Sequence, residues 1–474
     1  MSRARSVCLV LSAAAAAASL LGCPKSEPES GGSASASAAF PMPSAPTAMA
    51  SAPSASASAA PAPPPPCTAE AAFVIDKGAR ADTGLTVTEL TNGKLAGVGY
   101  AVGEGIPRVA TVDDTGKVTK LEPDWSHVRD AEQKKDPKMV RHVYRVTALG
   151  MKNGKMRVGM DLLDAFPEKG QGSYLRCGPA DVEPVIADEG GAQFDAPTED
   201  QVAALAAASD TEGGTVDFRD CRTFGGADKA FVLATQVKRE GPGDDHNLLY
   251  QWIIDEIPGK GLLKDFVIDK RVAKPGKDGT YPKVEHFITP VAIPMGDLGV
   301  MITARDSGNL VFVKRTAKLE KAGDAVAMSL GASPGMPALN IENGQVYVAT
   351  TEFQKTDLYG VLFPATDKPA KPQKIGITDP NPPTEGARDS ASLDVLPDGN
   401  IAVGFVDGKA PQRHARLTVL DKDMKQKLQG VFDVSPPEVN VVEMRVVGAS
   451  SGKVLVTTLA TDGTLSGTFV SCKY

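Results

Sequence analysis

The stretch NGQVYVATTEF, residues 343–353, combines a tight turn with a strand pattern. Asn343 and Gly344 are residue types that tolerate positive φ, which the two-residue turns of β-hairpins require. The residues after them are rich in valine, tyrosine and threonine, which favour the pleated surface of a sheet. The stretch therefore predicts a hairpin whose turn contains Gly344 and whose next strand follows at once.

The same combination of turn glycine and apolar, β-branched run recurs along the chain. The other copies are NGKLAGVGYAV (92–102), NGKMRVGMDLL (153–163), GGADKAFVLATQV (225–237), MGDLGVMITARD (295–306), DGNIAVGFVDG (398–408) and SGKVLVTTLAT (451–461). Successive turn glycines are 61, 72, 70, 48, 55 and 53 residues apart. About seven repeats of a three- or four-stranded antiparallel unit predict an all-β fold, a β-propeller of seven blades. Six or eight blades stay open, as does a pair of β-sandwich domains, since turn spacing suits both folds.

One stretch of this region resembles a known repeat. VATVDDTGKV, residues 109–118, is similar to the Asp-x-x-Thr-Gly-Lys hairpin of quinoprotein-like propellers, which include outer-membrane assembly lipoproteins. The resemblance covers about ten residues of one blade, so it supports the fold and points to no specific family. The glycines of the preceding GVGYAVG (97–103) are interpreted as strand glycines that leave room for a neighbouring strand.

The first residues of the chain have the order of an export signal. Arg3 and Arg5 precede an apolar run over residues 7–21, which is too short for a confident membrane-spanning helix. LLGC, residues 20–23, resembles the lipobox of bacterial lipoprotein precursors. The resemblance implies cleavage of a signal peptide, residues 1–22, and acylation of Cys23, whose three lipid chains would bind the protein to a membrane.

A tether follows the acylated cysteine. Residues 23–66 are almost wholly alanine, serine, proline and glycine after Cys23, a composition that predicts a disordered spacer. Residues 67–474 are then the repeat domain. Localisation is expected at the bacterial cell envelope, and Pro24 in place of aspartate after the cysteine favours the outer membrane. The face of the membrane stays open.

Charge and cysteine content narrow the function classes. The formal charge of −7 becomes −9 when Arg3 and Arg5 leave with the signal, and such an acidic chain is a poor match for nucleic acid. Four cysteines remain in the domain, and none shows the CxxC spacing of a metal or redox site. In a closed ring the last unit meets the first, which predicts disulfides between Cys67 and Cys472 and between Cys177 and Cys221.

Motifs of catalysis are weak. GASPG, residues 331–335, fits the pattern of a hydrolase nucleophile elbow, but Pro334 follows Ser333 where the motif needs a helix. PTEDQVAALAAASD (197–210) predicts one short helix inserted between strands. No catalytic residue, metal ligand or cofactor is predicted.

The remaining candidate is the axis of the propeller, which the first strand of each blade lines. Those strands carry polar side chains. Two interpretations of them stay open: a ligand site at one mouth of the axis, or pairing of these residues with one another. The candidates are Glu89, Asn340, Asp394, Glu443 and Arg445.

The sequence favours a lipid-anchored envelope protein whose propeller is a binding or scaffolding module for an envelope protein. A propeller enzyme, such as an exported hydrolase or lyase acting at the axis, is the second hypothesis. An envelope sensor subunit is the third.

Overall fold

The chain divides into two units, residues 1–65 and 66–474, and the computed structural model describes residues of the second. Cys23, the predicted signal, nearly all of the tether and the predicted helix at 197–210 lie outside the described residues. The description runs from 66 to 473 with gaps at 91–94, 104, 122–139, 153–154, 167–170, 183–192, 195–215, 227–229, 239–247, 258–260, 273–287, 307, 331–334, 352–357, 366–372, 378–388 and 429.

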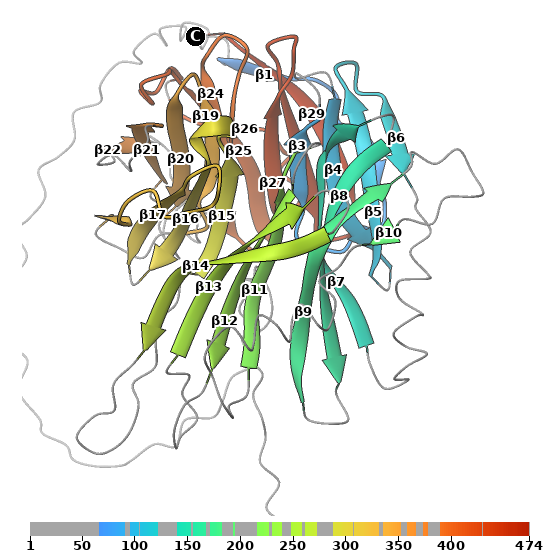
Figure 1. Cartoon of the computed structure of the whole chain (residues 1–474). Coiled ribbons are helices and arrows are strands. Elements are labelled where there is room, and N and C mark those ends of the chain that lie inside the picture. The colour runs from blue at the N-terminus through green and yellow to red at the C-terminus, as the bar shows by residue number, and fades with distance from the viewer. Residues whose placement is uncertain are drawn as a thin grey trace, which may run out of the picture. The chain divides into compact units, whose positions relative to one another are not determined.

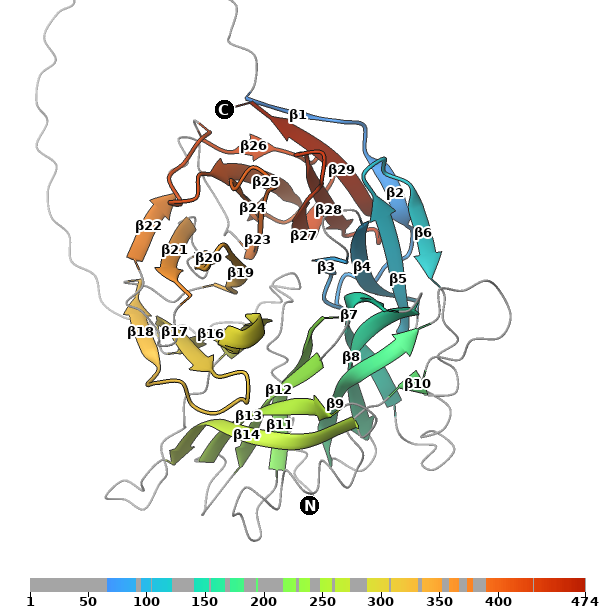
Figure 2. The same cartoon turned by 45° about the horizontal axis from the view of Figure 1, so that its top comes forward.

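The described strands form seven antiparallel sheets, here called blades 1 to 7, which follow one another round a ring (Figure 2). Blade 1 contains β3 (Thr86–Glu89), β4 (Leu95–Val102), β5 (Ile106–Asp113) and β6 (Val118–Leu121). Blade 2 contains β7 (Val140–Lys152), β8 (Lys155–Phe166), β9 (Gln171–Val182) and β10 (Gln193–Phe194). Blade 3 contains β11 (Val216–Gly225), β12 (Ala230–Lys238), β13 (Leu248–Ile257) and β14 (Gly261–Val272). Blade 4 contains β15 (Ile288–Pro294), β16 (Val300–Asp306), β17 (Asn309–Arg315) and β18 (Val326–Ser329).

The last three blades repeat this plan. Blade 5 contains β19 (Ala338–Glu342), β20 (Gln345–Thr351), β21 (Leu358–Pro364) and β22 (Gln373–Ile377). Blade 6 contains β23 (Asp389–Val395), β24 (Ile401–Lys409), β25 (Gln412–Leu420) and β26 (Phe432–Asp433). Blade 7 combines β27 (Val441–Gly448), β28 (Val454–Ala460) and β29 (Leu465–Cys472) with β1 (Cys67–Ala69), and β2 (Phe73–Asp76) also pairs with β29.

The ring is closed by its two ends. β1 pairs antiparallel with β29, and Cys67 stands opposite Cys472 in this register. A disulfide joins these two cysteines, as the sequence predicts. The backbone N–H of Lys473 donates to the carbonyl of Pro66 at 2.8 Å and continues the pairing. The first and last strands thus share one blade.

Inner strands of neighbouring blades contact each other all the way round, from β3 through β7, β11, β15, β19, β23 and β27 back to β3. Seven sheets in a continuous ring make a seven-bladed β-propeller, in agreement with the predicted repeat. Figure 1 shows the strands of blades 2 and 3 extending past the others on one side. β7 has 13 residues and β14 has 12, and the two longest repeat intervals begin at the turn glycines of these two blades. The part of the chain that the structure describes contains no helix long and apolar enough to cross a membrane.

The repeat glycines mark one place in every blade, the connection between its first and second strands. Gly344 has φ of 72°, Gly399 of 81° and Gly452 of 80°. This left-handed backbone is the conformation for which the sequence pattern selects glycine. The hairpin interpretation is therefore confirmed at these turns.

The hydrophobic core lies between neighbouring blades. Val98 and Tyr100 of blade 1 pack with Val447 and Leu455 of blade 7, and the other described clusters likewise join adjacent sheets. Close approach requires glycine in β4, because a Cβ atom at Gly99 would overlap the carbonyl oxygen of Val146 in β7. This confirms the predicted role of the strand glycines.

Candidate functional site

The five polar residues predicted at the axis all belong to the inner strands of blades 1, 5, 6 and 7. Glu89 ends β3, Asn340 lies in β19 and Asp394 in β23. Glu443 and Arg445 lie two residues apart in β27. The structure divides these five side chains into two groups.

Asp394 is the centre of the first group, which links three blades. Its Oδ1 accepts a hydrogen bond from Asn340 Nδ2 at 2.6 Å and another from the backbone N–H of Val395 at 3.0 Å. Its Oδ2 accepts one from the N–H of Gly448 in blade 7 at 2.6 Å. Both oxygens of one carboxyl group are thus used to hold blades 5, 6 and 7 together.

Burial raises the pKa of the Asp394 carboxyl to about 7. The nearby carboxylate of Glu89 adds to this rise in pKa, because a second negative charge disfavours ionisation. The hydrogen bonds from Gly448, Val395 and Asn340 act in the opposite direction on the pKa. At neutral pH this carboxyl therefore exists in both protonated and ionised forms.

Glu443 and Arg445 form the second group. Glu443 Oε2 accepts a hydrogen bond from the backbone N–H of Leu85 at 2.8 Å, which joins blade 7 to the start of blade 1. Glu443 Oε1 pairs with the guanidinium of Arg445, whose Nη1 donates to the carbonyl of Met444 at 2.7 Å. Arg445 and Gly448 are about 10 Å apart along β27, at the usual rise of a strand, so this pair is separate from Asp394.

Other polar side chains also bridge neighbouring blades, at the junction of blades 6 and 7 and at that of blades 2 and 3. Ser392 Oγ of β23 accepts a hydrogen bond from the N–H of Val446 at 3.0 Å. Asp161 of β8 accepts one from the N–H of Thr223 in β11 at 3.1 Å, and it also pairs with Arg145 at 3.0 Å. A carboxylate in such a place stabilises the ring. Its presence alone is no sign of catalysis.

A cavity of about 330 Å³ lies at one end of the inner strands of blades 1, 5, 6 and 7. It is here called the axial cavity. Its lining residues come from the end of β3 and from the turns that follow β19, β23 and β27. They are Glu89, Glu342, Asn343, Val395, Leu396, Pro397, Gly399, Gly448 and Ser450.

Of the five predicted residues, Glu89 lines this cavity directly, and Gly448 and Val395 connect it to Asp394. Sequence reasoning missed Glu342 and Asn343. Glu342 precedes the Asn-Gly turn, and Asn343, with φ of 48°, is part of it. Both residues are exposed. Blades 1, 5 and 6 each have an acidic residue shortly before the turn glycine, and this shared position is the sequence pattern that indicates Glu342.

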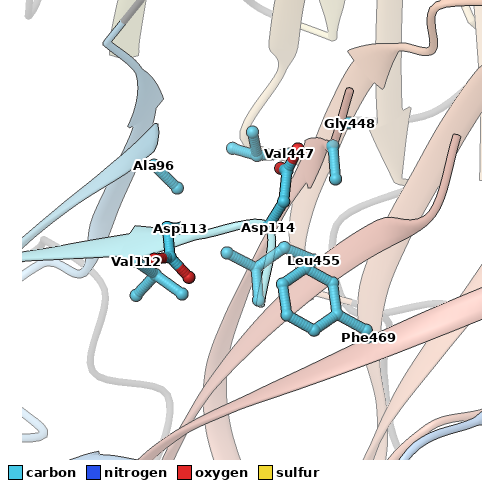
Figure 3. Close-up of a pocket in the computed structure, with 9 residues that line it drawn as sticks. Ala96, Val112, Asp113, Asp114, Val447, Gly448, Leu455 and Phe469 are labelled. Carbon is cyan, nitrogen blue, oxygen red and sulfur yellow. The ribbon is translucent and has the colours of Figure 1, made fainter. Parts of the chain in front are cut away.

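A second, much smaller pocket lies at the seam between blades 1 and 7 (Figure 3). Its walls are mostly apolar, from Val112, Leu455 and Phe469, with Asp113 and Asp114 beside them. Its volume of about 10 Å³ admits at most a single water molecule. Of these two spaces in the described part of the chain, the axial cavity is the larger.

Titratable groups in the described part of the chain form no cluster of three or more that could hold a metal ion. Cys67 is buried in its disulfide. Cys177 and Cys221 belong to β9 and β11, which contact each other, but their side chains lie outside the described residues. Their pairing, like the acylation of Cys23, stays a prediction, and Ser333 also lies outside the described residues.

No protein-family model matches the chain, and no curated protein matches it. Solved structures share a distant likeness. The NanB sialidase of Streptococcus pneumoniae has 11% identity and a TM-score of 0.41, covering 84% of this chain and 70% of that one. The dihydro-heme d1 dehydrogenase NirN has 11% identity and a TM-score of 0.40, covering 83% and 68%. BBS1N in complex with ARL6DN has 13% identity and a TM-score of 0.42, covering 85% and 97%. All three TM-scores are below 0.5, so the fold is assigned from the ring of sheets and not from these likenesses.

Proposed function

We propose that this chain is a lipid-anchored protein of the bacterial cell envelope whose β-propeller is a binding or scaffolding module. The LLGC sequence at residues 20–23 and the spacer after it support the anchor. The observation that supports binding over catalysis is the use of Asp394. Its two oxygens accept three hydrogen bonds from Asn340, Val395 and Gly448, so they are committed to the ring.

An enzyme acting at the axis is the second candidate, and one observation favours it. A carboxyl group with a pKa near 7 beside a second carboxylate is the kind of pair that general acid–base catalysis uses. A catalytic acid must also reach its substrate. Asp394 accepts a hydrogen bond from the N–H of Gly448 and is not among the residues that line the axial cavity, which weakens the enzyme hypothesis.

The anchor is tested by replacing Cys23→Ser and fractionating the cells. We expect the variant to leave the membrane fraction, because a chain without the acceptor thiol receives no lipid. Cys8→Ser is the matched control, since Cys8 lies inside the predicted signal and its loss should change nothing. Unchanged membrane retention of the Cys23 variant would refute the anchor.

The module is tested by mild crosslinking in intact cell envelopes followed by mass spectrometry of the co-purified proteins. A lipoprotein that carries residues 1–66 alone is the control. We expect a reproducible protein partner that depends on residues 67–474. Absence of any partner above the control contradicts the scaffold, and turnover of an exported substrate that depends on Asp394 would favour the enzyme.

A further inference from the structure

The outermost strand of blade 7 depends on its disulfide more than on its packing. β1 makes three residue pairs with β29 and lies along its outer side, beside the C-terminus (Figure 2). Of its three residues, Cys67 is buried, Thr68 is exposed and Ala69 is partly buried. The one fully buried side chain of β1 is therefore the one that forms the covalent bond.

Another short outer strand shows what holds such a strand without a disulfide. β26 has two residues, and Leu428 and Val434 on either side of it are buried in the core between blades 6 and 7. β1 has no such apolar flanks, because residue 66 before it and residues 70–72 after it are exposed. The covalent bond takes the place of the flanking apolar side chains.

Three polar contacts supplement the pairing of β1. The N–H of Lys473 donates to the carbonyl of Pro66 at 2.8 Å, and the N–H of Glu70 donates to the carbonyl of Phe469 at 2.8 Å. The Glu70 carboxylate also pairs with Lys453 at the surface, where an ion pair contributes little to stability. Hydrogen bonds exchanged with water add little net stability, whereas ordering each residue costs conformational entropy.

The next strand is held differently. The ring of Phe73 in β2 lies 5.9 Å from that of Phe469, and Ile75 is buried in the core shared by blades 7 and 1. β2 pairs with the first three residues of β29, which pairs with β28 from Leu465 to Val470. The ring can therefore stay closed through β2 when β1 leaves.

We propose that the Cys67–Cys472 disulfide is a redox latch that ties residues 66–72 to the edge of β29 and releases them when a dithiol reduces it. A thiolate of the dithiol attacks Sγ of Cys472, which is partly exposed, and Cys67 leaves as a thiolate. The second thiol of the reductant then displaces Cys472 from the mixed disulfide. Two electrons and two protons pass to the two cysteines, and the reductant leaves as a disulfide.

Opening the latch changes the edge of the blade and the length of the free chain. The end of β29 from Val470 to Cys472 loses its partner strand. Residues 66–72 join the segment that precedes them, and seven residues add up to about 23 Å of extended chain. The latch thus sets the reach of this segment, and this inference does not depend on the membrane anchor.

The test is hydrogen–deuterium exchange, read by mass spectrometry, on the mature full-length protein before and after reduction with dithiothreitol. We expect the amides of residues 67–72 to exchange at least about tenfold faster after reduction, because local opening exposes them to solvent. The amides of β28 should exchange equally in both states. Iodoacetamide should then label Cys67, which is 1% exposed in the latched protein.

Two double variants isolate the latch. Cys177→Ser/Cys221→Ser removes the other two cysteines of the domain, so its response to dithiothreitol comes from the latch alone. Cys67→Ser/Cys472→Ser should show the fast exchange of residues 67–72 without any reductant, and dithiothreitol should not change this exchange further.

The latch is overturned if residues 67–72 keep their slow exchange after reduction, because β1 would then stay in place without the bond. It is also overturned if dithiothreitol leaves the disulfide intact in the folded protein. Faster exchange across all seven blades would overturn it as well, since the bond would then hold the whole ring. None of these outcomes bears on membrane retention or on crosslinked partners.

Discussion

Cys67 and Cys472 face each other across the antiparallel pair of β1 and β29, and their disulfide spans 405 residues of sequence. β1 has three residues, so its backbone pairing alone is short. The covalent bond therefore fixes the seam of the ring at the place where the chain enters and ends.

Removing this disulfide should lower the free energy of unfolding. Loop entropy gives about 6 kcal/mol as an upper value for so long a closed loop. We expect the double variant Cys67→Ser/Cys472→Ser to unfold at a clearly lower urea concentration than the oxidised parent. Equal urea midpoints would show that the disulfide does not stabilise the ring.

The second predicted disulfide is tested by peptide mapping without reduction. β9 and β11 contact each other at the junction of blades 2 and 3. Cys177 pairs in register with Asp161. The Asp161 carboxylate accepts a hydrogen bond from Thr223, which lies two residues after Cys221. We expect one linked peptide pair that contains Cys177 and Cys221. Free thiols at both positions, or either cysteine linked to Cys67 or Cys472, would contradict the prediction.

Asp394 should make stability depend on pH. Its folded-state pKa of about 7 is raised above the ordinary 3.8, so the folded protein holds a proton that the unfolded chain releases. The stabilising effect of this proton is full below about pH 4 and is lost as the pH rises through 7. We expect the stability of the parent relative to Asp394→Asn to fall by about 2 kcal/mol between pH 4 and pH 8, after allowance for partial exposure.

Urea unfolding of both proteins at several pH values gives this difference directly. The carboxyl groups of Asp76, Asp113 and Asp462, whose pKa values are lowered, contribute equally to parent and variant and cancel. Stability curves that run parallel from pH 4 to pH 8 would exclude the raised pKa of Asp394.

Glu443 and Arg445 should be energetically coupled. Glu443→Gln leaves the largely buried guanidinium of Arg445 without its carboxylate, and we expect a loss of about 1 to 3 kcal/mol in the free energy of unfolding. The double variant Glu443→Gln/Arg445→Gln should lose less than the sum of the two single variants. A double-mutant cycle by urea unfolding measures the coupling, and strict additivity would disprove it.

The local features of this fold were predictable because they depend on neighbours in sequence. Gly344, Gly399 and Gly452 occupy the turns that their Asn-Gly, Asp-Gly and Ser-Gly pairs predict, and their positive φ is the physical reason. The pairing of Cys67 with Cys472 followed from the idea that a ring joins its ends.

The axial cavity was harder to predict because it depends on which turns meet after the ring closes. Glu342 and Glu89 are 253 residues apart, and the repeat pattern does not show that they line the same space. Asp394 and Glu443 were expected at the axis, but their bonds to Gly448 and Leu85 depend on the packing of adjacent blades. Spacing along one strand carries no information on that packing.

The disulfide at the seam also sets the mechanical behaviour of the molecule. A pull on the chain from the side of residue 66 meets the single hydrogen bond between Pro66 and Lys473 and then Cys67, where the sulfur bridge passes it covalently to β29. The three residue pairs of β1 then bear none of this load, so the blade is not peeled open strand by strand. Tension instead enters β29 at Cys472, and it passes to the six residues from Leu465 to Val470 that pair with β28.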